Sequence, residues 1–376
     1  TAAITVNNTD GTCTANITNN LSNRNIIING AMRVAQRGTS FAAPADGYTL
    51  DRWSVYENLS TAQVALTQET VTDLIGFDKA TKINTTTAET GVPSASGNQY
   101  LTYIQPIETT NLLHIGNGTS AAKPLIFSFY VKSNVTGTFC VSFYKQDNTT
   151  RLISLPYTIN SANTWERKTL SIPGDTSGGG INDDKGQGIA VYFILARKTG
   201  YTGTTSTSWI NYTDSGWAPT CTGTIVENVN DHIFITGCQL EVDHTGSGVA
   251  TDFEHRSFAQ ELALCQRYFQ RWKGHSDHNG IGAGRGNGSE GVFVSVNLMQ
   301  CLRAAPSITN SGIVCFRTGD SSVSTSTTPA ITSASAFDST SCIFPMNVTG
   351  LSGITNNQGG FTIFLSSSDL LLDAEL

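Results

Sequence analysis

Apolar positions along most of this chain alternate with polar ones, a pattern that places every second side chain on one face of a β-strand. In the segment 125–132, one face would carry Leu125, Phe127, Phe129 and Val131. The same alternation recurs in the segments 138–145, 188–197 and 292–298. Clusters of Gly, Asn, Asp and Pro lie between such runs and accept the dihedral angles of turns. The pattern predicts an antiparallel β-sandwich of many short strands.

One segment departs from the two-residue period. Ser257 is a candidate N-cap, and Gln260 follows three residues later, which is the signature of a capping box. Apolar residues then recur at alternating spacings of four and three, as on one helical face: Phe258, Leu262, Cys265, Phe269 and Trp272. We predict a helix over 257–272 whose apolar seam either covers the chain's own core or meets a symmetry-related subunit.

The chain divides into four predicted parts. Residues 1–24 are rich in Thr and Asn and hold few large apolar side chains, so they predict an extended arm without its own core. Residues 25–256 would form the main sandwich, and 257–272 the connecting helix. Residues 273–376 begin with a Gly-, His- and Asn-rich loop and would form a second, smaller β domain. No repeat at a solenoid or propeller period stands out.

The charge balance narrows the class of partner. The chain of 376 residues holds 22 Lys or Arg and 29 Asp or Glu, which gives a net charge of −7. An acidic chain without a basic run lacks the electrostatic footprint of a nucleic-acid binder or of a protein that binds anionic membranes. No stretch reaches the ~18 apolar residues of a membrane helix, and no export signal is visible. We therefore expect a soluble protein with neither nucleic-acid binding nor membrane insertion.

The eight cysteines are scattered along the chain, without a Cys-x-x-Cys pair or a Cys/His cluster at zinc spacing. Free cysteines are often buried as small hydrophobes, so we expect mostly reduced, buried thiols.

Three polar segments could act in catalysis or bind a metal, but for each of them the sequence favours a structural or solvent-exposed role. Glu254-His255-Arg256 could act in acid–base catalysis, but adjacent side chains of an extended chain point to opposite faces, which favours a structural corner. The His275–His278 segment could bind a metal but lies in a Gly-rich loop without regular support. Asp183-Asp184 could bind calcium, but the sequence around these residues lacks the signature of a calcium-binding loop. We predict no catalytic residue, no metal site and no cofactor.

Aromatic residues in loops are the candidate glycan contacts. Sugars need flat aromatic faces for their C–H surfaces and nearby amides or carboxylates for their hydroxyls. A Gly-, Thr- and Ser-rich stretch over 200–224 holds the most loop-like aromatic residues: Tyr201, Trp209, Tyr212 and Trp217. Packing beneath a long connection remains an equal alternative for them. Trp53 and Trp165 lie in strand-like segments, and we expect both to be core residues.

Eight segments carry a resemblance to a known family in their order along the chain. They are 25–40 (NIIINGAMRVAQRGTS), 48–53 (YTLDRW), 164–168 (TWERK), 236–241 (TGCQLE), 253–256 (FEHR), 261–269 (ELALCQRYF), 303–306 (RAAP) and 373–376 (DAEL). In this succession they resemble tailed-bacteriophage virion proteins, usually described as tail-fibre or head-fibre proteins with a carbohydrate-binding-module-like domain. Residues 1–24 fall outside the resemblance.

The resemblance implies a jelly-roll sandwich similar to sugar-binding jelly rolls, a homotrimer, and a place in a virion that is assembled in the host cytoplasm. We predict a structural protein that is not an enzyme: a fibre, decoration or adaptor subunit. Residues 1–24 would dock on other virion proteins, and host surface polysaccharide is a candidate ligand.

The alternative is a glycan-degrading, tailspike-like enzyme. Glycosidases need two carboxylates at a defined separation, which the sequence does not reveal. Tailspikes usually contain a long repetitive β-helix, and the missing repeat counts against this class.

Overall fold

The computed structural model of the chain describes residues 4–6, 13–15, 23–44, 46–89, 99–197, 201, 203, 205–273, 279–288, 291–311, 314–318, 323–326, 330–333, 338–352, 354, 359–364 and 369–376. Most of the predicted arm 1–24 lies outside these residues, as does the His275–His278 segment. Within the arm, β1 (Ile4–Val6) pairs antiparallel with β2 (Cys13–Ala15).

Contacts divide the chain into two compact units. The first comprises residues 1–33, 39–49 and 53–256, and the second comprises 34–38, 50–52 and 257–376. Two short segments from the N-terminal part of the sequence therefore belong to the second unit, whereas the sequence predicted one continuous sandwich over 25–256.

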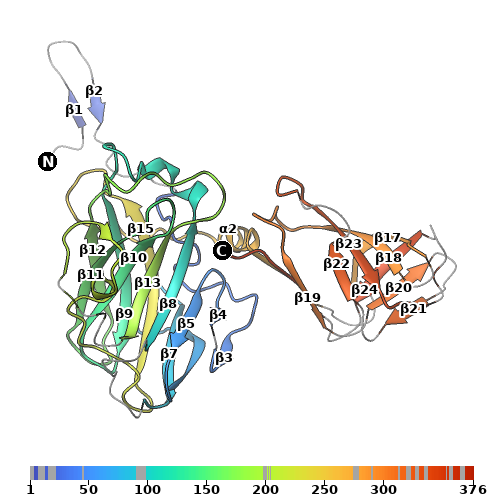
Figure 1. Cartoon of the computed structure of the whole chain (residues 1–376), viewed down its shortest axis with the longest axis horizontal. Coiled ribbons are helices and arrows are strands. Elements are labelled where there is room, and N and C mark those ends of the chain that lie inside the picture. The colour runs from blue at the N-terminus through green and yellow to red at the C-terminus, as the bar shows by residue number, and fades with distance from the viewer. Residues whose placement is uncertain are drawn as a thin grey trace. The chain divides into compact units, whose positions relative to one another are not determined.

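Besides the β1–β2 pair, the first unit contains two larger antiparallel sheets (Figure 1). In pairing order, the first sheet consists of β14 (Ile210–Asn211), β11 (Arg151–Ile159), β10 (Gly137–Lys145), β13 (Gln187–Arg197), β8 (Tyr100–Glu108), β5 (Ser54–Asn58) and β4 (Gly47–Tyr48). The second sheet consists of β12 (Glu166–Ile172), β9 (Leu125–Ser133), β15 (His232–Val242), β7 (Lys79–Thr87), β6 (Gln63–Thr70) and β3 (Ser40–Ala42).

The strand order is that of a jelly roll. Eight strands, β7 to β13 and β15, are distributed between the two sheets in the orders β7-β15-β9-β12 and β8-β13-β10-β11. Two interlocked Greek keys produce this arrangement, in which successive strands cross repeatedly from one sheet to the other. The predicted fold class, an antiparallel jelly-roll sandwich, is confirmed.

Alternation fills the core between the two sheets as the sequence predicted. Phe127 and Phe129 of β9 are fully buried, and the Phe129 ring meets Phe193 of β13 edge-on with 4.9 Å between ring centroids. Trp53 is also fully buried and stacks on Tyr103 at 4.9 Å, so its assignment to the core is confirmed.

Trp165 differs from the expectation of a core residue. It directly precedes the edge strand β12 and is only partly buried, with its indole Nε1 donating to Asp73 Oδ1 at 2.8 Å. Lys132 Nζ lies 4.8 Å from the centre of its ring. An edge position leaves one face of the indole without a neighbouring strand, so polar groups cover it instead.

The second unit is also β. A three-stranded antiparallel sheet holds β16 (Phe269–Lys273), β25 (Asp369–Asp373) and β19 (Ser307–Ser311). A seven-stranded antiparallel sheet holds β21 (Val323–Ser326), β20 (Val314–Thr318), β24 (Gly359–Phe364), β17 (Asn279–Gly286), β18 (Gly291–Asn297), β23 (Ile343–Thr349) and β22 (Ala330–Ser333). Buried apolar residues of its core include Val292, Val294, Val296, Phe344, Met346, Val348, Leu370 and Leu372. The predicted C-terminal β segment, 273–376, lies within this unit.

The predicted helix is real but shorter. α2 runs over Phe258–Gln266 and begins with the predicted capping box, in which Ser257 Oγ accepts from Gln260 N at 3.3 Å. Phe269 and Trp272 lie on β16, which pairs along its whole length with β25. A strand about 100 residues further along the chain offers ladder hydrogen bonds that local periodicity does not reveal, and this tertiary pairing overrides the helical spacing.

The predicted seam is accordingly split. Cys265 and Phe269 are buried, Trp272 packs against the core of the second unit, and Leu262 is partly buried. Phe258 is 48% exposed. The other helices are short: α1 (Asp214–Trp217) and the 3-10 turns η1 (Thr109–Asn111) and η2 (Leu113–Ile115). None of the helices among the described residues is long and apolar enough to cross a membrane.

Two disulfides correct the expectation of mostly reduced thiols. Cys140 pairs with Cys221 and Cys301 pairs with Cys342, across sequence separations of 81 and 41 residues. Partners so far apart leave no spacing signal in the sequence. Cys238 and Cys265 are free and buried, as expected for small hydrophobes. Nothing tests the expectation for Cys13 and Cys315, whose side chains lie outside the described part of the chain.

Candidate functional site

The outer face of the first sheet carries a row of tyrosines. In β10 and β13, the residues Phe143 and Phe193 point into the core, so the alternate residues Tyr144 and Tyr192 point outward. Both outward rings are partly exposed, and they meet edge-on with 6.0 Å between centroids. Tyr56 of β5 lies on the same face, opposite Thr102 of β8, and is 42% exposed.

The connection after β13 extends this row. Tyr212 is 39% exposed, and its ring lies 5.4 Å from that of Tyr144. On the other side, Trp217 contacts Tyr192 at 6.3 Å and Tyr100 at 5.8 Å. We call the accessible residues Tyr56, Tyr100, Tyr144, Tyr192 and Tyr212 the tyrosine row.

Three of the four predicted loop aromatics are buried. Tyr201, Trp209 and Trp217 are each only 7–8% exposed. The Trp209 indole Nε1 donates to the backbone oxygen of Pro173 at 2.8 Å, and Trp217 packs against Tyr201 at 4.9 Å. These large apolar rings fill the space beneath a long connection, which is the packing alternative that the sequence left open. Tyr212 alone keeps an accessible ring.

The strand tyrosines of this row were not among the glycan contacts predicted from the sequence. Tyr144 and Tyr192 occupy polar-face positions of alternating strands, where a large aromatic side chain is unexpected. A large aromatic residue at an outward position of a strand was therefore the sequence feature that could have indicated these contacts. It carries little weight alone, because the sequence does not show whether a loop covers that face.

Three tyrosines of the row, Tyr100, Tyr192 and Tyr212, have a raised pKa and keep their hydroxyl protons near neutral pH. Burial is the main reason that the pKa of Tyr192 and that of Tyr100 are raised above the usual value for tyrosine. The pKa of Tyr212 is raised by burial and by its hydrogen bond to Asp214 Oδ1, which its hydroxyl reaches at 3.0 Å. The row therefore presents flat rings together with the neutral hydroxyl groups of these three residues, a surface suited to polyhydroxylated ligands.

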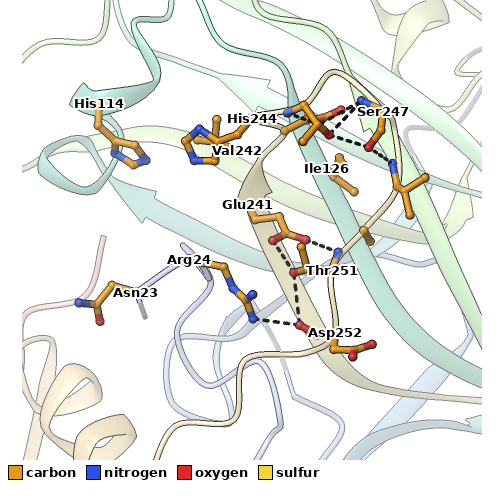
Figure 2. Close-up of a pocket in the computed structure, with 14 residues that line it drawn as sticks. Asn23, Arg24, His114, Ile126, Glu241, Val242, His244, Ser247, Thr251 and Asp252 are labelled. Carbon is orange, nitrogen blue, oxygen red and sulfur yellow. Dashed lines mark hydrogen bonds between the residues drawn. The ribbon is translucent and has the colours of Figure 1, made fainter. Parts of the chain in front are cut away.

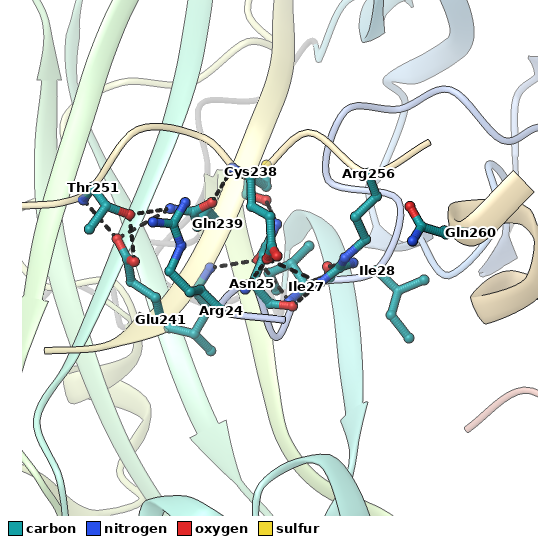
Figure 3. Close-up of polar contacts among 12 residues, drawn as sticks. Arg24, Asn25, Ile27, Ile28, Cys238, Gln239, Glu241, Thr251, Arg256 and Gln260 are labelled. Carbon is teal, nitrogen blue, oxygen red and sulfur yellow. Dashed lines mark hydrogen bonds and ion pairs between the residues drawn. The ribbon is translucent and has the colours of Figure 1, made fainter. Parts of the chain in front are cut away.

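The segments that resemble the phage family lie outside the tyrosine row, and their residues make contacts within the fold. Asn25 Nδ2 donates to the backbone oxygen of Cys238 at 3.0 Å, and Asn25 N donates to Glu254 Oε2 at 2.7 Å (Figure 3). Arg256 Nη1 donates to the backbone oxygen of Ile27 at 3.1 Å. The side chain of His255 lies against Phe77, with 5.2 Å between ring centroids. The structural interpretation of 254–256 is confirmed.

A second group of such segments meets in the second unit. Arg52 forms an ion pair with Glu375, and its guanidinium lies 3.5 Å from the centre of the Tyr268 ring. Arg37 reaches Asp373 at 2.9 Å and Glu375 at 3.3 Å. Burial raises the pKa of Glu375 more than Arg52 and Arg37 lower it. These contacts explain why segments 34–38 and 50–52 belong to the second unit.

The described residues contain no group of three or more His, Cys, Asp or Glu side chains that could hold a metal ion. Asp184 is engaged within its own turn, where its Oδ1 accepts from Gly186 N at 2.8 Å.

Comparison with known proteins gives matches among solved structures only. No protein family and no curated protein matches the chain. The enzymatically active domain of bacteriophage CBA120 tailspike protein 4 is 12% identical with a TM-score of 0.29, and the match covers 58% of this chain and 21% of that one. The chain thus spans about a fifth of that protein.

Two carbohydrate-binding modules from Clostridium thermocellum also match. The family 11 module, solved with a β-1,3-1,4-mixed-linked tetrasaccharide, is 11% identical with a TM-score of 0.27, covering 58% of this chain and 98% of that one. The C-terminal family 22 module of the xylanase Xyn10B is 13% identical with a TM-score of 0.28, covering 56% and 98%. At these TM-scores the matches carry no argument, and the jelly-roll assignment rests on the strand order.

Proposed function

We propose that this chain is a structural virion protein of a tailed bacteriophage, a fibre, decoration or adaptor subunit, which binds host surface polysaccharide and does not cleave it. The resemblance of eight ordered segments to phage virion proteins supports the virion assignment. Asn25, Arg52 and Glu375 of these segments make contacts within the fold, as expected of a structural protein.

The tyrosine row is the observation that carries the binding proposal. It provides several partly exposed rings in contact with one another on one sheet face, together with neutral hydroxyls. One ring stacked on a sugar contributes on the order of 1 kcal/mol, by analogy with aromatic pairs. A single site would therefore be weak, and threefold presentation would raise the avidity by ~10²–10⁴ where the geometry allows.

We expect Tyr212→Ala to weaken retention of host polysaccharide by about five-fold per site, because about 1 kcal/mol of stacking is lost. Tyr144→Ala should act in the same direction. Affinity electrophoresis of the purified protein in gels with host polysaccharide measures the change.

Trp165→Ala is the matched control, because Trp165 is a partly exposed aromatic residue beside the other sheet. A loss of retention in this variant, with Tyr212→Ala unchanged, would contradict the tyrosine row as the binding face. Time-dependent shortening of the polysaccharide would instead establish the tailspike-like enzyme.

The proposal includes a homotrimer and docking of residues 1–24 on other virion proteins. We expect light scattering of the purified full chain to give three times the chain mass of 40.1 kDa at micromolar concentration. A stable monomer would contradict this. The exposed Phe258 on α2 is the candidate for a subunit contact, and Phe258→Asp tests it by shifting the mass toward that of the monomer.

A further inference from the structure

A pocket of about 630 Å³ lies at the end of β15 in the first unit, away from the tyrosine row. Its floor includes Ile126 of β9 and Glu241 of β15, which lie opposite each other in the ladder. The loop 243–252 forms one wall, and Arg24 and His114 contribute from other parts of the chain (Figure 2). The volume falls within the ~300–1,000 Å³ of small-molecule sites.

The carboxylates of the pocket are engaged by their own surroundings. Glu241 Oε1 accepts from Thr251 N at 2.8 Å, and Oε2 accepts from Thr251 Oγ1 at 2.6 Å. Asp243 Oδ2 accepts from Gly248 N at 2.8 Å, and its Oδ1 accepts from Thr245 and Ser247. Burial would raise the pKa of Asp243, but these hydrogen bonds outweigh it and lower the pKa. Both carboxylates therefore hold the loop in place.

Arg24 and two histidines bring nitrogen-bearing side chains to the same pocket. Arg24 Nη2 donates to the backbone oxygen of Asp252 at 3.2 Å, whereas the buried Nε finds no hydrogen-bond partner among the described residues. The imidazoles of His114 and His244 line the same pocket and lie close enough to influence each other. The guanidinium of Arg24 carries a permanent charge and N–H donors, which suit an anionic oxygen.

We propose that this pocket binds the carboxylate of an acidic sugar residue, of the hexuronate type, within a polysaccharide. Arg24 and the two histidines bind the carboxylate, while Ser247 and Thr251 lie beside the sugar hydroxyls. This inference rests on the proposed polysaccharide binding. The tyrosine row would stack on sugar rings of any charge, and the pocket would add a preference for acidic sugars.

Binding should depend on pH through the histidines. Burial lowers the pKa of His114, and the neighbouring Lys123 and His244 lower it further. Arg24 adds a permanent positive charge, whereas Glu241, Asp243 and Asp252 line the same pocket with carboxyl groups. Protonation of His114 shifts this balance toward the anion, and because the pKa of His114 is lowered, the affinity for an acidic sugar should rise as the pH falls below 6.

Isothermal titration of the full chain with trigalacturonate and with its fully methyl-esterified form tests the proposal. Hydrogen bonds to charged groups lead us to expect roughly ten- to hundred-fold tighter binding of the free acid at pH 6. Arg24→Gln should remove this preference, the exposed His244→Gln should reduce it, and His114→Gln should flatten its pH dependence. Arg33→Gln, which changes a surface arginine paired with Asp78, is the matched control and should keep the preference.

Equal binding of acid and ester by the native chain, or a full preference in a folded Arg24→Gln protein, overturns the proposal. Retention of neutral polysaccharide is measured separately on the same protein. A chain that retains neutral polysaccharide but binds acid and ester equally overturns the pocket alone. A chain that prefers the acid yet retains no host polysaccharide supports the pocket and contradicts the proposed function.

Discussion

Arg52→Ala will destabilise the second unit by about 3–5 kcal/mol near pH 8, because removing one partner of a buried ion pair leaves the other charge poorly compensated. The side chains of Arg52 and Glu375 are only 1% and 3% exposed. The variant also loses the contact of the guanidinium with the Tyr268 ring. Hydrogen exchange of peptides from β16 and β25 and urea unfolding measure the loss.

The loss of stability in Arg52→Ala should increase as the pH rises. Burial already raises the pKa of Glu375, and the loss of Arg52 raises it further. The folded variant then binds a proton that the unfolded chain releases above about pH 4.3, so its stability falls as the pH rises from 5 toward 8. Arg33→Ala is the control, since Arg33 and Asp78 are 41% and 57% exposed and such pairs contribute under about 1 kcal/mol. Equal losses in the two variants, or a loss in Arg52→Ala that does not change with pH, would contradict the buried ion pair.

Trp217→Ala will cost the first unit about 3–5 kcal/mol, the usual loss when a buried tryptophan is truncated. The Trp217 ring packs against Tyr100, Tyr192 and Tyr201, and Ser154 Oγ donates to its backbone oxygen at 2.9 Å. Polysaccharide retention should fall together with stability, because two members of the tyrosine row lose their support. Chemical denaturation and affinity electrophoresis of the same preparation measure both.

Trp165→Ala serves as the control here as well. Its ring is partly exposed and is held by a hydrogen bond to Asp73, so the loss of stability should stay below about 1 kcal/mol. A Trp217→Ala protein with native stability and lost retention would mean that Trp217 contacts the ligand directly.

The helix shows how far local pattern reaches. Ser257 and Gln260 form the predicted capping box, because a cap is made by residues three positions apart and needs no distant partner. The end of the helix depends on β25, which pairs with Phe269 and Trp272. Spacings of four and three fit a helix, yet a strand partner far along the chain decided the conformation.

The candidate sites likewise depend partly on local sequence and partly on contacts between distant residues. The Gly-, Thr- and Ser-rich composition of 200–224 pointed to a connection with aromatic residues, but their burial depends on which surface that connection covers. Trp209 and Trp217 fill its underside, and Tyr212 stays accessible. The pocket could not be predicted at all, because Arg24, His114 and Glu241 come from three distant parts of the sequence.

The sequence by itself determined the class of fold, since a two-residue period of apolar side chains suits one pleated face and is written in each strand separately. It also determined the start of α2, whose cap depends on neighbours in the chain. The tertiary structure decided the jelly-roll pairing order, the two disulfides, the tyrosine row and the Arg52–Glu375 pair. Each of these joins residues tens to hundreds of positions apart, and their proximity arises only when the sheets pack.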